Sequence, residues 1–380
     1  MFSSLVSLIR SLYRTNALIP IHKPYFDDKE KEYLCNTIDS TFVSSVGKFV
    51  SQFENEISSY TGLSYAIATV NGTSALHTAL LLVGVEENTE VLTQSFTFVA
   101  TCNAVSYCKA NPVFIDIEPE SLGLCPSSLK AFLEEFGEIR DDGNCWNRST
   151  GFRISACLPM HSFGFPCKIN EISAICHQYN IPLVEDAAES LGSFQYDNHT
   201  GSFGDCGILS FNGNKIITTG GGGMILTNDQ KLSTRAKHIT TTAKVRHPWE
   251  FVHDEIGFNY RMPNLNASIG LAQLEKLPVF LKSKRSLASE YLNWGQKHGF
   301  LFIQESKNSS ANYWLNTLVT ENRQQRDQFL KETNENGIMT RPAWTPMHQL
   351  PIYGNYYKKN LSNTERLFDR LVSLPSSPIL

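Results

Sequence analysis

Between residues 51 and 228 the chain alternates short runs of β-forming residues with longer runs of helical periodicity. Several of the short runs are apolar on both faces. The predicted strands are residues 65–70, 90–93, 113–115, 154–160, 182–185, 207–211 and 224–227. The predicted helices are residues 73–83, 98–108, 127–136 and 170–179. Strands without a polar face are typical of a parallel sheet that helices cover on both sides, so the pattern predicts a mostly parallel, doubly wound α/β fold.

The alternation of strands and helices ends at about residue 271. After it, helical stretches around 273–291 and 323–335 flank a β-like run at 313–319. We therefore expect a large α/β domain over residues 21–270 and a smaller C-terminal α+β domain over residues 271–380. Residues 1–20 are expected to form a tail or a short amphipathic helix. Residues 141–151 are polar, contain two glycines and lack periodicity, which predicts a surface loop.

Composition and charge exclude several classes of protein. Of the 380 residues 41% are hydrophobic and 18% are charged, and the net charge of -4 does not favour a nucleic-acid partner. No stretch is long and apolar enough to span a membrane, and the N-terminal segment lacks the pattern of a signal peptide. The nine cysteines have no metal-ligand spacing, so we expect reduced thiols, no metal and a cytoplasmic protein.

Two segments with candidate chemistry each follow a predicted strand. The first is Asn71-Gly72-Thr73-Ser74, where a glycine turn opens a helix whose free N–H groups could bind a phosphate. Its alternative reading is an ordinary helix cap. The second is Val184-Glu185-Asp186, where a carboxylate at the end of a strand could pair with a cationic ring nitrogen. Its alternative reading is again a cap.

Two further segments follow other strands. Ser210 and Lys215 lie on a loop before a run of four glycines, where a lysine could form a Schiff base or could simply be a solvated surface residue. Phe98 follows residues 90–93 and could stack on a flat ring or belong to the core. Because the carboxyl ends of parallel strands meet at one edge of a sheet, we expect all four segments to gather there.

From about residue 20 onward the chain resembles the DegT/DnrJ/EryC1/StrS family of nucleotide-sugar aminotransferases, which are fold-type I enzymes dependent on pyridoxal 5'-phosphate (PLP). The resemblance rests on NGTSALH, TFVATCNAV, VEDAAESLGS, SFNGNKIITTGGGGM and GFNYRMPNLNASIGLAQLE. Four stretches are most similar to the branch that makes legionaminic acid and bacillosamine, namely TFVSSVGKFVSQFE, SFNGNK, TTTAK and ANYWLN. Where many members have a glutamate in the glycine run after the lysine, this chain has Gly221.

The resemblance implies a role for each matching residue. Lys215 would bind the PLP aldehyde covalently and act as the catalytic base, and Asp186 would pair with the ring nitrogen. Ala188 and Phe98 would lie on the two faces of the ring, and Glu189 near its phenolic oxygen. The phosphate would be bound by Thr73, Ser74 and Ser210, together with Asn259 of the second subunit in a homodimer with shared active sites. The weaker candidates Arg341 and His348 would lie near the sugar nucleotide.

The implied reaction is PLP-dependent transamination of a nucleotide-linked 4-keto-6-deoxy sugar, with L-glutamate as the amino donor, for bacterial surface amino-sugar biosynthesis. A UDP-linked N-acetylated sugar is the first expectation and a GDP-linked sugar the second. Two alternatives stay open: a PLP enzyme that acts only on amino acids, and a catalytically silent regulatory subunit with the same fold. Family members that dehydrate sugars have histidine at the position of Lys215, which favours transamination here.

Overall fold

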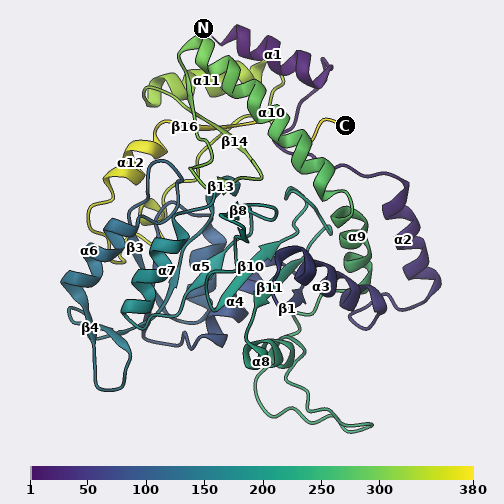
Figure 1. Ribbon diagram of the computed structural model, residues 1–380, viewed down its shortest axis with the longest axis vertical. Coiled ribbons are helices and arrows are strands. Elements are labelled where there is room, and N and C mark those ends of the chain that lie inside the picture. Colours follow the sequence, from purple (N-terminus) through teal and green to yellow (C-terminus); the bar gives the residue numbers. More distant parts are fainter. Residues whose placement is uncertain (1) are drawn as a thin grey trace.

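The computed structural model describes residues 2–380. Its centre is a sheet made of two joined parts (Figure 1). One part has the order β3 (Asn111–Ile115), β2 (Thr89–Gln94), β6 (Arg153–Leu158), all parallel. The other has the order β7 (Val184–Asp186), β10 (Cys206–Ser210), β11 (Gly223–Thr227), β1 (Tyr65–Thr69). Parallel bridges from Cys157 to Leu183 and from Met160 to Asp186 join the two parts. Of the seven strands named here, β11 alone runs in the opposite direction to the others, so the predicted mostly parallel sheet is confirmed.

Alternate residues of the central strands pack into different cores. Ala66 and Ala68 of β1 lie in a cluster with α3 (Lys48–Thr61) and α9 (Asn264–Leu274). Ile67, between them, lies in a cluster with α4 (Gly72–Leu82) and α8 (Gln230–Thr240). Because successive strand side chains point to opposite faces, burial of both sets requires helices on both sides of the sheet. The helices α5 (Val99–Tyr107), α6 (Pro126–Phe136) and α7 (Ile169–Gln178) flank the β3–β2–β6 part.

The predicted surface loop at residues 141–151 is wrong in part. The segment contains β5 (Cys145–Asn147), which pairs with β4 (Gly137–Ile139) as a hairpin beside β6. Cys145 and Asn147 are buried, and the Asn147 amide donates a hydrogen bond to Glu90 at 2.8 Å. These strands are three residues long, too short for a periodic pattern, and they are formed by pairing with their neighbours.

A second, antiparallel sheet lies in the C-terminal part of the chain. Its order is β12 (Leu301–Phe302), β14 (Asn316–Val319), β16 (Leu371–Leu374), β15 (Arg341–Pro342), with α10 (Leu277–His298), α11 (Arg323–Glu335) and α12 (Ser362–Phe368) around it. The remaining elements are α2 (Asp28–Asp39), the short helices Ser162–Gly164 and Met347–Gln349, and a small sheet of β8 (Phe194–Gln195), β9 (Asn198–His199) and β13 (Ser309–Ser310). No helix within residues 2–380 combines the length and the apolar character needed to cross a bilayer.

The N-terminal segment forms the helix α1 (Ser3–Tyr13), one of the two forms expected for residues 1–20. Phe2, Leu5 and Ile9 are fully buried in one cluster with Trp294 of α10 and Phe329 of α11. A bridge between Ile19 and Ile338 continues this contact. The two ends of the chain are therefore folded together, as the neighbouring positions of α1, α10 and α11 in Figure 1 show. A domain boundary near residue 270 stays a prediction.

Candidate functional site

A cavity of about 240 Å³ opens where the carboxyl ends of the central strands meet. Asn71 to Thr73 follow β1, Asp186 ends β7 and Ser210 ends β10. In a parallel sheet these ends lie at one edge, which is the usual place for a ligand. The lining residues are Asn71, Gly72, Thr73, Leu76, Phe98, Ala100, Met160, Asp186, Ala188, Glu189, Ser210, Asn212, Asn214, Lys215, Trp314 and Trp344. The structure thus brings together seven of the predicted site residues.

The first turn of α4 forms one wall of the cavity. Asn71 caps this helix, because its side chain accepts a hydrogen bond from the Ser74 N–H at 2.7 Å. The residue preceding Thr73 must be small, since a Cβ atom on Gly72 would lie 2.9 Å from the Cβ of Ser210. Thr73 and Ser210 therefore lie close together beside the positive end of the helix dipole, an arrangement suited to an anion. Ser74 is buried on the same turn, behind the residues that line the cavity.

The carboxyl of Asp186 lies at the floor of the cavity, 2% exposed. The Thr101 hydroxyl donates to its Oδ2 at 2.7 Å, and the backbone N–H of Ala188 donates to its Oδ1 at 3.2 Å. Burial raises the pKa of Asp186 above its ordinary value, because desolvation disfavours the carboxylate. A cationic group bound in the cavity would offset this cost. A turn rather than a helix follows Asp186, which argues against the alternative reading of this residue as a helix cap.

The amino group of Lys215 reaches the cavity from the loop after β10. Its Nζ lies 3.1 Å from Oε1 of Glu189 and 4.1 Å from the centroid of a Trp314 ring. The other Glu189 oxygen accepts the backbone N–H of Phe163 at 2.8 Å. Burial raises the pKa of Glu189 to about 7, although the nearby Lys215 opposes the shift. Lys215 is consequently a held side chain rather than a solvated one.

The two phenylalanines that follow β2 have different surroundings. Phe96 is fully buried, whereas Phe98 is 46% exposed and lines the cavity. The ring of Phe98 meets Trp344 edge-on, with 6.0 Å between ring centroids. Ala188 lines the same cavity. Phe98 is therefore not a core residue, and the cavity offers its ring room to contact a flat ring.

Besides Ser74, three predicted residues do not line this cavity. Asn259 is exposed and forms a bridge with Thr241. Arg341 is exposed, and its guanidinium donates to Asn334 at 3.2 Å. His348 is buried, with its Nδ1 2.6 Å from the Ser95 hydroxyl. Their roles stay predictions.

Sequence reasoning missed two aromatic residues of the cavity, Trp314 and Trp344. Trp314 lies within ANYWLN, one of the stretches that carried the family resemblance, and Trp344 lies between the candidates Arg341 and His348, but no role was assigned to either. The one signal in the sequence was that both residues are tryptophans, whose rings can contact a flat ligand or a cation. Their position in the cavity depends on how the C-terminal part of the chain folds back onto the central sheet.

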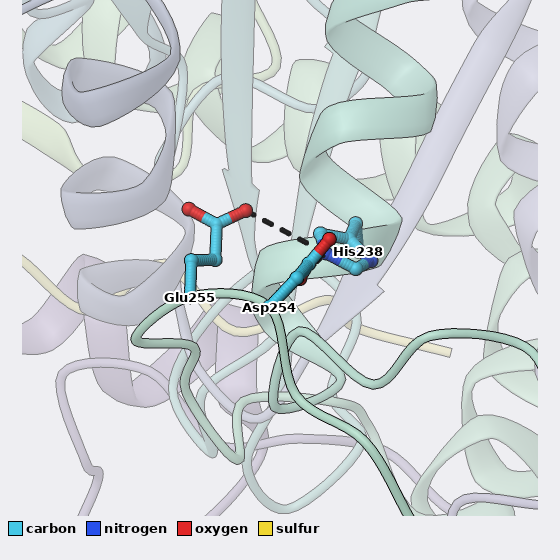
Figure 2. A group of neighbouring side chains, drawn as sticks. All are labelled: His238, Asp254 and Glu255. Carbon is cyan, nitrogen blue, oxygen red and sulfur yellow. Dashed lines mark hydrogen bonds and ion pairs between the residues drawn. The ribbon is translucent and has the colours of Figure 1, made fainter.

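A second group of ionisable side chains lies on α8 and the loop after it (Figure 2). His238 Nε2 is 2.7 Å from Asp254 Oδ1 and 3.5 Å from Glu255 Oε1. The guanidinium of Arg235 also pairs with both Glu255 oxygens. His238 and Arg235 belong to α8, whereas Asp254 and Glu255 belong to the loop. These ion pairs therefore hold the loop against the helix.

Comparison with known proteins agrees with this geometry. The sequence profile of the DegT/DnrJ/EryC1/StrS aminotransferase family matches residues 24–380. EpsN of Bacillus subtilis (strain 168), named as a pyridoxal phosphate-dependent aminotransferase, is 36% identical, and the match covers 94% of this chain and 90% of EpsN. The GDP-perosamine synthase of Escherichia coli O157:H7 is 35% identical over 95% of this chain and 94% of its own length.

Solved structures show the same relationship. The aminotransferase TlmJ from Streptoalloteichus hindustanus superimposes with a TM-score of 0.85 at 25% identity, covering 95% of this chain and 94% of TlmJ. DesI, solved with its TDP-sugar product, has a TM-score of 0.82 at 26% identity and covers 95% of this chain and 88% of its own. The chain thus belongs to the DegT/DnrJ/EryC1/StrS aminotransferase family and is a PLP-dependent nucleotide-sugar transaminase with a fold-type I structure.

Proposed function

We propose that Lys215 and Asp186 are the catalytic residues of a transaminase that aminates a nucleotide-linked 4-keto-6-deoxy sugar with L-glutamate as donor. The observation that carries the proposal is their shared cavity. Lys215 follows β10 and Asp186 ends β7, two adjacent parallel strands. A lysine and a buried acid at the same sheet edge are the two groups that PLP requires of a protein.

The lining of the cavity fits PLP. Asp186 would pair with the ring nitrogen, since its buried carboxyl is held by a hydroxyl and an N–H rather than by a basic side chain. The phosphate would be held by Thr73 and Ser74, in the first turn of α4, and by Ser210. Ala188 and Phe98 would contact the faces of the ring, and Glu189 would lie near its phenolic oxygen. When bound, PLP supplies an electron sink for the charge that develops at the carbon losing its proton.

In the reaction, the side chains of the protein would move protons and keep the cofactor ring positively charged. The neutral amino group of Lys215 would take the proton from the α carbon of glutamate as general base. In the second half of the cycle it would give a proton to the sugar carbon that receives the amine. Asp186 would remain ionised and keep the ring nitrogen of the cofactor protonated, because opposite charges a few ångströms apart stabilise each other in a buried site.

The nucleotide part of the substrate has two candidates. The branch that the sequence resembles most favours a UDP-linked N-acetylated sugar, and we propose it as the first candidate. The match to GDP-perosamine synthases at 35% identity favours a GDP-linked sugar as the second. In both cases the product would be an amino sugar for a bacterial surface polysaccharide, a role supported by the 26% identity to the spore coat polysaccharide biosynthesis protein SpsC of Bacillus subtilis (strain 168).

The decisive experiment offers the holoenzyme a panel of UDP- and GDP-linked 4-keto-6-deoxy sugars together with L-glutamate. Mass spectrometry of the aminated sugar and the yield of 2-oxoglutarate measure the reaction. We expect one nucleotide series to be aminated in a Lys215-dependent manner. Conversion of glutamate without amination of any sugar would favour an enzyme that acts only on amino acids, and absence of both reactions would favour a regulatory subunit.

The alternative of a PLP enzyme that acts only on amino acids, such as a desulfurase with a catalytic cysteine, has little support in the structure. Cys206, the cysteine nearest to Lys215 in sequence, is fully buried in β10. Burial raises the pKa of its thiol to about 12, which leaves almost no thiolate at neutral pH. All nine cysteines are free, which supports the proposal of a cytoplasmic protein.

We also propose a homodimer with shared active sites, in which Asn259 of one subunit contacts the cofactor phosphate of the other. Asn259 is exposed and is not part of the cavity lining of its own chain. The loop that precedes it projects from the body of the molecule (Figure 1). Three apolar side chains on this loop, Trp249, Phe251 and Ile256, are between 75% and 88% exposed. Exposed apolar groups of this size support burial against another subunit.

A further inference from the structure

The amino group of Lys215 is enclosed by two side chains to which the proposed reaction assigns no proton transfer. Glu189 presents an oxygen at 3.1 Å on one side, and Trp314 presents the face of a ring at 4.1 Å on another. A carboxylate and an aromatic face both attract an ammonium group. The arrangement therefore favours one position of the Lys215 side chain when it is not bonded to the cofactor.

Hydrogen bonds fix both walls of this enclosure. Glu189 is 3% exposed, and its second oxygen accepts the Phe163 N–H at 2.8 Å. The Trp314 indole N–H donates at 2.7 Å to the carbonyl of Asn214, the residue that directly precedes Lys215. The ring is thus tied to the same loop that carries the lysine.

Asn312 joins the two walls to each other. Its amide Nδ2 donates to the backbone carbonyl of Glu189 at 2.8 Å, and its Oδ1 accepts the backbone N–H of Trp314 at 2.7 Å. Gly164 leaves the space that Asn312 occupies. A Cβ atom at Gly164 would lie 1.9 Å from Oδ1 of Asn312. Asn312 therefore fixes a segment of the C-terminal part of the chain against the turn after β7 that carries Glu189.

We propose that Glu189 and Trp314 are positioning residues that form a seat for the free ammonium group of Lys215. Glu189 attracts the amino group by charge, and Trp314 directs Nζ toward the cavity. This inference rests on the proposed role of Lys215 as the cofactor lysine. Each time the lysine is released from the cofactor, the seat returns its amino group to the same place.

The test uses the full-length protein from which the cofactor has been removed. Lys215 is labelled with trinitrobenzenesulfonate between pH 8 and 10, where Glu189 is ionised, and the labelled peptide is quantified by mass spectrometry. Glu189→Gln keeps the size of the side chain and an oxygen for the Phe163 N–H but removes the charge. Because the ion pair with Glu189 restrains Nζ, we expect labelling of Lys215 to become about tenfold faster when the carboxylate is removed. The matched control is Glu290→Gln, at an exposed position on α10, which should leave the rate unchanged.

A second pair of variants tests the aromatic wall. Trp314→Leu should accelerate labelling of Lys215 about two- to fivefold, whereas Trp314→Phe, which keeps a ring face, should change it by less than about twofold. Equal effects of the two variants would overturn the role of the ring. An unchanged labelling rate in a Glu189→Gln protein of normal thermal stability would overturn the role of the charge. If that protein does not fold, Glu189→Asp replaces it, and the seat predicts that its rate lies within about threefold of the native one.

These measurements need no substrate and no catalysis. If the proposed function is wrong, the cofactor will be found on another lysine or no sugar will be aminated, while the labelling results stand. If only the seat is wrong, amination proceeds and Lys215 labels at the same rate in every variant. The two failures are therefore distinguishable.

Discussion

At the scale of single residues, the site is governed by the cost of burying charge. Asp186 and Glu189 are both almost completely buried, and burial raises the pKa of each. A buried carboxylate is stable only when it is hydrogen-bonded or paired with a cation. Glu189 has Lys215 as its partner within the chain, whereas Asp186 has a hydroxyl and an N–H. Because the donors to the Asp186 carboxyl are both neutral, a positively charged pyridinium ring would be a fitting partner for it.

The first prediction concerns the covalent attachment of the cofactor. Reduction of the holoenzyme with borohydride should fix the cofactor on Lys215, because its Nζ is the lysine amine that reaches the cavity. Peptide mapping by mass spectrometry locates the label. The Lys215→Ala variant serves as the control and should remain unlabelled. A label on a different lysine, or none in the native protein, would refute the assignment.

The second prediction concerns the charge of Asp186. Asp186→Ala should fold but convert bound cofactor with glutamate at least about a hundredfold more slowly, since an unpaired ring nitrogen loses its proton and with it the electron sink. Single-turnover absorbance of the cofactor measures the rate. Thr101→Val, which removes only the hydroxyl bonded to Asp186, should have a smaller effect. A near-native rate in Asp186→Ala would reduce this residue to a structural role.

At the scale of elements, the N-terminal helix α1 illustrates how distant segments form one core. Its apolar residues recur at positions 2, 5 and 9, the spacing of a single helix face. That face packs against α10 and α11, almost three hundred residues further along the chain. The helix is therefore an integral part of the C-terminal core rather than a tail.

The third prediction follows from this packing. Leu5 is fully buried, so Leu5→Ala should lower the free energy of unfolding by about 2–5 kcal/mol through lost burial and a new cavity. Ser7→Ala, at an exposed position of the same helix, should leave it nearly unchanged. Chemical denaturation measured by circular dichroism gives both values. Equal stabilities of the two variants would show that α1 contributes little to the core.

At the scale of the whole molecule, the exposed loop before Asn259 is the feature that a single chain does not explain. It is fastened to α8 through the ion pairs of His238 and Arg235, yet its apolar tip faces solvent. A loop that is anchored at its base and apolar at its tip is suited to contact a second copy of the chain. The proposed shared active site would give this contact a catalytic purpose.

The fourth prediction tests sharing by mixing two inactive proteins. Lys215→Ala lacks the cofactor lysine, and Asn259→Asp should repel the cofactor phosphate by charge. If the site is shared, each hybrid dimer contains one site with both lesions and one native site. Random exchange makes about half of the dimers hybrid, so roughly a quarter of all sites should recover activity. Activity equal to the average of the two parents, despite proven subunit exchange, would place Asn259 outside the partner's site.

The sequence by itself determined those features that depend on neighbouring residues. Apolar residues on both faces of several short runs predicted a mostly parallel sheet that helices cover on both sides, and the positions of Asp186, Ser210 and Lys215 at or after the ends of predicted strands predicted where they would meet. Tertiary structure decided what depends on pairing between distant segments. The hairpin at β4 and β5, the packing of α1 against α10, and the arrival of Trp314 and Trp344 in the cavity are of this kind. Local pattern fixes which face of a strand or helix is apolar, but the partner that covers it is chosen by the packing of the whole chain.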